Sequence, residues 1–161
     1  MELSREQKQI NLFIGLAASI FISHYNYRML HEEEDRTKFL TKSIPAYFNF
    51  INELLINDFF LQVTRIMDRH EFQKRKNLTV SFIVNMPIWN DKQKDVLNHY
   101  QEKLKILADK IKPARHRIIA HNDLETYEND DNLGGFDGPL DRNFIIILEE
   151  FCNYIHKEAF G

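Results

Sequence analysis

The chain has 161 residues and a mass of 19.3 kDa, which is the size of one domain with a single core. Hydrophobic residues make up 43% and charged residues 28%, while Gly and Pro number only five and four, so the composition excludes disordered and collagen-like chains and argues against a turn-rich β-sandwich. The net charge of −3 gives no global signal of nucleic-acid binding, so any such site has to be local. The single cysteine, Cys152, excludes an internal disulfide and cannot form a zinc site alone.

The N-terminal segment predicts a long apolar helix. Ser4 and Gln7 fit a capping box, so we expect a helix that starts near Ser4 and runs to about Leu30. Its apolar stretch, Ile10–Ile22, is shorter than the ~20 residues that span a bilayer. The charges before it are mixed, which does not fit a signal peptide. We therefore expect a heavily buried helix, placed centrally or at a subunit interface, in a cytoplasmic protein that does not enter a membrane.

The next segments predict two more helices. The acidic run HEEED, residues 31–35, fits a solvated turn or a helix start, and a helical turn is expected over Arg36–Lys42. Pro45 then fits the first turn of a new helix that runs to about Met67. Apolar residues at helical spacing predict that this helix is central: Tyr47, Ile51, Leu54, Leu55, Val63 and Ile66.

The second half of the chain predicts a short helix over residues 77–86, a long helix from Asn90–Asp91 and a last helix from about Asp141. Pro113 lies inside the long helix and is expected to kink or restart it. The polar stretch Asp123–Pro139 reads as a long surface loop. The apolar faces of the two long helices are expected at Leu97, Leu104, Leu107, Ile111, Ala114 and Ile118, and at Phe144, Ile147, Leu148, Phe151 and Ile155. The sequence thus predicts an all-α, up-and-down bundle of about five helices in a single domain, residues 1–161.

Several kinds of chemistry are excluded by motif. The chain has no P-loop, no glycine pattern for dinucleotides, no HExxH and no pair of metal-binding cysteines. No Glu is followed three residues later by His, which a di-iron bundle requires. We therefore expect neither a cofactor nor a metal.

One stretch concentrates reactive side chains. ARHRIIAHND, residues 114–123, holds two arginines and two histidines at the end of the long helix. Between Lys103 and Arg117 six basic residues stand against one acidic residue, a net charge of +5. Histidine moves protons near neutral pH, and a guanidinium binds phosphate and stabilises developing charge. These groups suffice for RNA cleavage, in which the 2′-hydroxyl attacks the adjacent phosphorus. A structural alternative stays open: His121 continues the apolar stripe and caps the helix, whose negative end the basic residues favour.

Three blocks of sequence resemble one family. Arg115 and His121 resemble the R-x4–6-H motif of HEPN domains, and the wider string ARHRIIAHND resembles that of the abortive-infection HEPN-like (AbiU-type) family. FLQVTRIMD, residues 60–68, resembles the family's arginine-aliphatic-x-Asp helix end, and KNLTV, residues 76–80, resembles the Asn-Leu-Thr/Ser segment that follows it. Order and spacing fit across residues 48–123.

The resemblance implies a HEPN-like helical domain that dimerises and brings two motifs into one cleft, often as a metal-independent endoribonuclease in phage defence or a toxin–antitoxin pair. By position, Arg115 holds the scissile phosphate, His121 is the general acid or base, and His116 positions them or the RNA. On an ideal α-helix Arg115 and His121 lie ~120° apart, whereas Arg117 and His121 share a face, so spacing alone favours Arg117. We place Arg115 first.

Supporting roles are expected for further residues of the two motif regions. Arg117, Lys112 and Asn122 are candidates for RNA binding. Arg65 and Asp68 are expected to be structural, as an ion-pair link to the motif helix, while Asp123 is expected to cap the helix end or orient His121. The basic residues 69–76 fit a solvated loop, or phosphate contacts if they border the cleft.

The expected partners are a second copy, RNA and an antitoxin protein. Two alternatives to the nuclease remain: a non-catalytic HEPN-type module that binds RNA, a nucleotide or a protein, and a structural dimer whose motif only packs.

Overall fold

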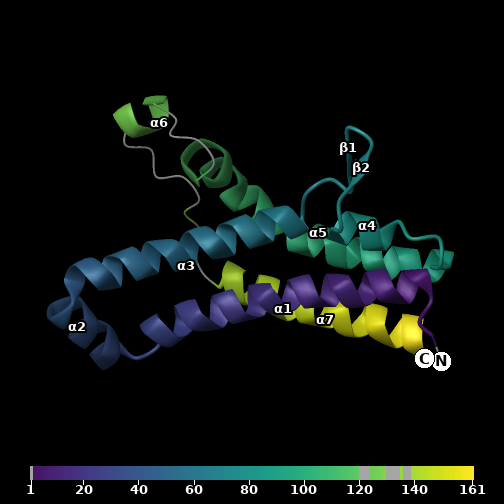
Figure 1. Ribbon diagram of the computed structural model, residues 1–161, viewed down its shortest axis with the longest axis horizontal. Coiled ribbons are helices and arrows are strands. Elements are labelled where there is room, and N and C mark those ends of the chain that lie inside the picture. The colour runs from purple at the N-terminus through teal and green to yellow at the C-terminus, as the bar shows by residue number, and fades with distance from the viewer. Residues whose placement is uncertain (1, 120–123, 130–134, 136–138) are drawn as a thin grey trace.

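The computed structural model describes residues 2–119, 124–129, 135 and 139–161. Figure 1 shows an elongated helical bundle in which the N- and C-termini lie together at one end. Four long helices form its body: α1 (Arg5–His31), α3 (Pro45–Ile66), α5 (Asp91–Ala114) and α7 (Leu140–Phe160). With α2 (Glu34–Ser43), which joins α1 to α3, they are the five longest helices described, so the predicted all-α bundle of about five helices is confirmed.

Five shorter elements are attached to this helical body in the described residues. The antiparallel hairpin β1 (Glu71–Phe72) and β2 (Arg75–Lys76) lies within the predicted polar connection, and α4 (Val80–Val84) is the predicted short helix. The π-helix η1 (Arg115–Ile119) continues α5, and α6 (Leu124–Glu128) stands off the bundle (Figure 1). In the described ranges, none of the helices combines the length and apolar character needed to cross a bilayer.

Local capping explains where the helices begin. The Ser4 hydroxyl accepts the Gln7 backbone N–H at 3.1 Å, and the Gln7 side chain accepts the Ser4 N–H at 3.0 Å, so the predicted capping box is confirmed. Asn90 and Gln93 form the same reciprocal pair at the start of α5. Each such cap stabilises the helix by ~1 kcal/mol, because it satisfies backbone donors that have no partner inside the helix.

The core lies along the axis of the bundle. Helix α1 packs against α3 and α7, and α5 packs against the same two helices, so α1 and α5 face each other diagonally. The predicted stripes of α5 and α7 are confirmed at most positions, since Leu97, Ile111 and Leu148 are fully buried. The side chain of Ile118 lies outside the described part.

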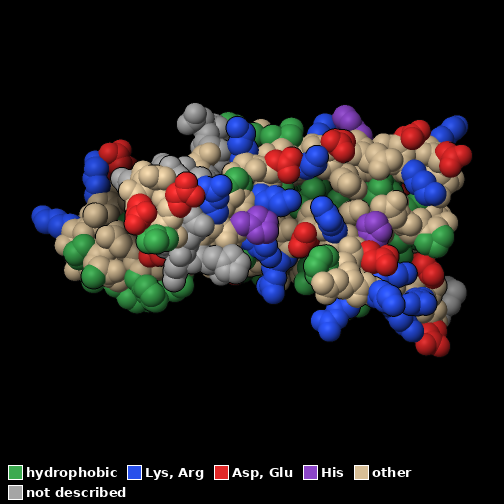
Figure 2. All heavy atoms as spheres, turned by 90° about the horizontal axis from the view of Figure 1, so that it is seen from above, with side chains coloured by type: hydrophobic (Ala, Val, Ile, Leu, Met, Phe, Trp, Pro, Cys, Tyr) green, Lys and Arg blue, Asp and Glu red, His purple; other side chains and the backbone are tan. Residues whose placement is uncertain are grey.

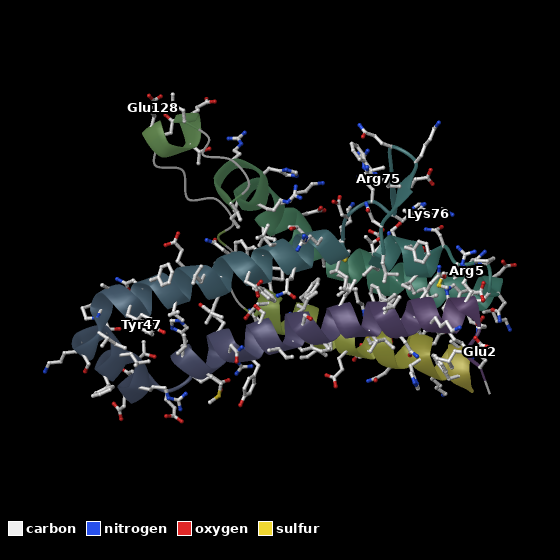
Figure 3. All side chains as sticks on the ribbon, viewed as in Figure 1. Glu2, Arg5, Tyr47, Arg75, Lys76 and Glu128 are labelled. Atoms are coloured by element: carbon white, nitrogen blue, oxygen red, sulfur yellow. The ribbon has the colours of Figure 1, made fainter. Side chains whose placement is uncertain are left out.

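Two burial predictions are wrong in part. Helix α1 buries one face, with Phe13 and Ala17 fully enclosed, but Leu12 on the other face is 64% exposed. On α3, Tyr47 is 62% and Leu54 48% exposed, and Figure 3 shows Tyr47 at the far end of the helix. The reason is tertiary: the first half of α3 extends past the ends of α5 and α7 (Figure 1), so these two helices do not cover its apolar stripe there.

Candidate functional site

The long helix α5 gives way to a π-helix at the point where the basic motif begins. Pro113 lies in the last turn of α5, and the five residues from Arg115 to Ile119 form the π-helix η1. Proline has no N–H for the helical ladder and its ring crowds the carbonyl four residues earlier, so the chain widens at this point. Pro113 was expected to kink or restart the long helix, and the α-helical winding does end one residue after it, where the chain continues as η1. Because a π-turn pairs residues five apart, the angles of an ideal α-helix do not apply to Arg115 and the residues after it.

A groove runs along one face of α5 and ends at this π-helix. Its cavity volume is about 220 Å³, and it is called the α5 groove below. One wall is a helical stripe of α5 continued into η1: Gln101, Lys105, Ala108, Asp109, Lys112, Arg115 and His116. The other wall comes from the end of α3, the three residues after it and α4: Thr64, Met67, Asp68, Arg69 and Ser81.

The α5 groove brings four of the predicted site residues together: Lys112, Arg115, His116 and Asp68. Arg117 is exposed and does not line it, and neither does Arg65. Three further predicted residues, His121, Asn122 and Asp123, lie outside the described residues.

Arg115 and His116 are in direct contact at the end of the groove. The Arg115 Nη1 donates to His116 Nδ1 at 3.1 Å. Because a guanidinium only donates, Nδ1 acts as an acceptor here, and the proton of the neutral imidazole is on Nε2. Arg115 is half-buried, and its Nε is buried with no hydrogen-bond partner among the described residues. This side chain therefore keeps one unused donor at the end of the groove.

The groove is locally basic on an acidic chain. Four cationic side chains line it, against Asp68 and Asp109. Both acids have contacts of their own: Asp68 accepts the Arg69 backbone N–H at 3.0 Å, and Asp109 lies 3.8 Å from the Lys105 ammonium. Figure 2 shows basic and histidine side chains gathered near the middle of this side of the molecule. Such a surface attracts anions in a protein that repels them overall.

The ion-pair link expected from Arg65 and Asp68 to the motif helix is not among the salt bridges of the described residues. Arg65 is exposed, and the two residues meet only through the backbone, where the Asp68 N–H donates to the Arg65 carbonyl at 3.3 Å. In the basic stretch after them, Arg69 lines the groove, whereas Arg75 and Lys76 lie on the projecting hairpin (Figure 3).

Sequence reasoning missed half of the groove. Gln101, Lys105 and Asp109 are polar positions of α5 that read as a solvated helix face. The signal that connects them is the spacing back from Arg115 through Lys112, Ala108, Lys105 and Gln101, which places them on one face of the helix.

A second polar cluster ties α1 to its neighbours. His24 Nε2 lies 2.9 Å from Asp141 Oδ2, and the Ser23 hydroxyl donates to Asp58 at 2.7 Å. Both α1 residues are buried, and His24 and Asp141 also line a cavity of about 350 Å³. Burial, followed by the charge of Asp141, raises the pKa of Tyr27 beside them. We interpret this cluster as structural, because each polar side chain has its partner within the bundle.

In the ranges that the structure describes, no three His, Cys, Asp or Glu side chains converge in a way that could hold a metal ion. What the α5 groove offers instead is two guanidinium groups, two ammonium groups, an imidazole and a neutral amide. In general, guanidinium and ammonium groups pair with phosphates, and an imidazole can accept or donate a proton.

The described residues form an all-α bundle in which Arg115 and His116 directly follow the end of the long helix α5. A protein-family model described as AbiU2 (HEPN_AbiU2) matches residues 6–161, and the chain belongs to this abortive-infection family. Searches of curated proteins and of solved structures gave no match.

Proposed function

We propose that the protein is a metal-independent endoribonuclease of a phage-defence or toxin–antitoxin system, and that residues 1–161 act as one domain in the cytoplasm. The observation that carries the proposal is the contact of Arg115 with His116 at the end of a basic groove, with the Arg115 Nε still unpartnered in the described structure. A half-buried guanidinium with free donor capacity is suited to a phosphate, because desolvation strengthens a charge-assisted hydrogen bond.

In the proposed reaction the 2′-oxygen of the RNA forms a bond to the adjacent phosphorus, and the bond from phosphorus to the 5′-oxygen breaks. His121 accepts the proton of the 2′-hydroxyl, and the departing 5′-oxygen takes a proton from solvent. Arg115 stabilises the charge that develops on the phosphoryl oxygens. His116, held through Nδ1 by Arg115, presents its Nε2–H to the phosphate or positions the RNA.

The remaining candidates support this chemistry. Lys112, on the wall of the groove, contacts an RNA phosphate, and the exposed Arg117 contacts a neighbouring one. Asn122 also binds RNA, and Asp123 orients His121. Arg65 and Asp68 support the end of α3 beside the groove through their backbone contact.

We also propose that the enzyme is a homodimer with two motifs in one cleft. Two exposed apolar surfaces are candidates for the interface. The outer face of α1, with Leu16 at 47% exposure, lies diagonally across the bundle from α5, whereas Leu124 at 69% exposure lies on the projecting α6, just after the motif (Figure 1). Of these two, contact through α6 brings two motifs closer together, because α6 follows the motif in the chain, so we place the interface there.

Matched charge insertions test this interface. Leu124→Glu is expected to produce a monomer that no longer cleaves RNA, since burying a carboxylate at an interface is strongly unfavourable. Leu16→Glu is the control and is expected to leave a dimer with full activity. Light scattering and cleavage are measured on the same samples. An active dimer of Leu124→Glu, or a monomer of Leu16→Glu, would place the interface elsewhere.

The catalytic proposal is tested by cleavage of RNA in EDTA. His121→Ala and Arg115→Ala are each expected to slow cleavage at least ~100-fold, the effect of losing a general base or a charge-stabilising donor. Arg142→Ala, an exposed arginine of α7 outside the α5 groove, is the matched control and is expected to cleave at the wild-type rate. Full activity of both motif variants would refute the assignment.

A second candidate is a HEPN-type module that binds RNA without cleaving it, with an antitoxin protein as a further partner. The observation in its favour is that His116 Nδ1 is occupied by Arg115, so this histidine does not serve as a base through that atom. This alternative predicts that a folded dimer binds RNA in a salt-sensitive way but does not cleave it. Measuring binding and cleavage on the same samples distinguishes it from the nuclease.

A further inference from the structure

The far end of the α5 groove holds a neutral amide side chain, and its oxygen has no hydrogen-bond partner in the part of the chain that the structure describes. Gln101 lines the groove, and its Oε1 is buried with no hydrogen bond among the described residues. Leaving a buried amide oxygen unpaired costs ~1–3 kcal/mol, because its water is lost and not replaced. Buried polar atoms are paired in the great majority of cases, so a ligand in the groove can supply the partner that this amide oxygen lacks.

The other short polar side chains of the groove are already engaged. The Thr64 hydroxyl donates to backbone carbonyls of its own helix, at 2.9 Å for Phe60 and 3.1 Å for Leu61. The Ser81 hydroxyl lies 3.0 Å from His70 Nδ1. Their partners are inside the protein, whereas the two buried unpartnered atoms of the groove belong to Gln101 and Arg115.

These two side chains mark the two ends of the groove. Gln101 and Arg115 are fourteen positions apart on the stripe, which corresponds to about 21 Å along the helix axis. Stacked nucleotides follow each other at ~3.4 Å, so a strand bound at Arg115 reaches Gln101 several nucleotides away. The Gln101 end is also electrically balanced, because the nearest cation of the stripe, Lys105, faces Asp109.

The chemistry of the amide selects the kind of group that it binds. Its carbonyl oxygen needs a donor, which a phosphate does not provide, and its NH₂ group provides a donor beside that acceptor. Nucleobase edges carry a donor next to an acceptor, and an amide pairs with such an edge through two hydrogen bonds. Met67 and Ala108 add apolar surface to the same groove, against which the plane of a base packs. A base enters so narrow a groove only when it is unpaired.

We propose that Gln101 is a base-recognition residue: the α5 groove binds single-stranded RNA with the scissile phosphate at Arg115 and the edge of an unpaired base at Gln101. This inference rests on the proposed function, since it names the part of the RNA that the same groove reads. It assigns sequence preference to a position several nucleotides from the cut, where no catalytic group is needed.

The test is Gln101→Leu, which keeps the size of the side chain and removes the amide. Wild-type protein and the variant are incubated with a single-stranded RNA library that is randomised around the cleavage site, and the products are sequenced. The wild type is expected to prefer one base at a fixed distance from the cut, and the variant to lose about ten-fold of that preference. With one preferred RNA, KM rises while kcat stays unchanged. Asn98→Leu, an exposed amide of α5 outside the groove, is expected to match the wild type.

Thermal unfolding without RNA separates recognition from a structural role. Removing an unpartnered buried amide is expected to leave the Tm of Gln101→Leu unchanged or raised. A clear fall in Tm would mean that the amide is paired within the fold and would overturn the proposal, as would an unchanged base preference.

Failure of this inference is distinguishable from failure of the proposed function. If the wild type binds the library without cleaving it, selection of the bound RNA replaces sequencing of the products. A base preference that is lost in Gln101→Leu then supports recognition by Gln101 in a non-catalytic module. Cleavage by the wild type with identical preferences in both proteins keeps the nuclease and overturns the role of Gln101.

Discussion

Salt dependence of RNA binding gives a quantitative test of the α5 groove, and Lys112→Gln is the perturbation. The variant removes one cation from the wall of the groove and leaves a slightly shorter polar side chain. Because Lys112 is exposed, we expect no measurable change in folding. Any change in RNA affinity is therefore attributed to the lost charge and not to unfolding.

The magnitude follows from the cations that line the groove, which are Arg69, Lys105, Lys112 and Arg115. Each phosphate contact to a single strand contributes ~0.7 to the slope of log K against log salt concentration, so four contacts give a slope of about −2.8. Lys105 already faces Asp109 at 3.8 Å, and without its contribution the slope is about −2.1. Between 50 and 200 mM salt the affinity is thus expected to fall roughly 20- to 50-fold.

The assay is fluorescence anisotropy with a short labelled single-stranded RNA at several salt concentrations. To prevent cleavage, every protein carries His121→Ala. Lys112→Gln is expected to reduce the magnitude of the slope by ~0.7. Lys110→Gln, an exposed lysine of the same helix that does not line the groove, is the control and is expected to keep the parent slope. Equal effects of the two variants, or a parent slope near zero, would refute the groove as the RNA site.

Three further predictions concern the fold. Burial, followed by the charge of Glu149, raises the pKa of the Cys152 thiol to about 12. The native state therefore keeps this proton above pH 9 while the unfolded chain releases it. Between the ordinary thiol pKa of 9.0 and the raised pKa of about 12, the free energy of unfolding is expected to fall by ~1.4 kcal/mol for each unit that the pH rises. Urea titrations of Cys152→Ala should lack this component of the pH dependence. Phe13 is fully buried, so Phe13→Ala is expected to cost ~3–5 kcal/mol in the same titrations, whereas Leu12→Ala, at 64% exposure, should change stability by less than ~0.5 kcal/mol. Pro113→Ala restores a backbone donor at the end of α5 and is expected to raise the Tm yet slow cleavage, since it favours an α-turn in place of η1. A lower Tm, or unchanged cleavage with a straightened helix, would contradict that link.

Local chemistry made the helices predictable from the sequence. The capping boxes at Ser4 and Asn90 are complete within four residues of chain, and the structure has both. The apolar stripe of α7 was likewise sufficient to predict its buried face, including Phe144 and Phe151. Pro113 predicted a kink or restart of the helix, but the spacing of the apolar residues does not predict that the chain continues as a π-helix.

Features that depend on how the helices pack against one another could not be predicted from the sequence. The exposure of Tyr47 depends on where α5 and α7 end, which no pattern within α3 encodes. The partners of the polar cluster are far apart in the chain, as His24 is 117 residues from Asp141. The groove end at Gln101 was missed for the same reason, since its walls come from three separate helices.

The most direct test of the central claim is one incubation in EDTA with RNA and DNA strands of the same sequence. The wild-type protein is expected to cut the RNA, leave a 2′,3′-cyclic phosphate at the new end and spare the DNA, because the attacking 2′-hydroxyl exists only in RNA. A folded dimer of Arg115→Ala/His121→Ala, verified by light scattering, is expected to cut neither strand. Cleavage of both strands by the wild type, or an unchanged rate in the double variant, would contradict the account.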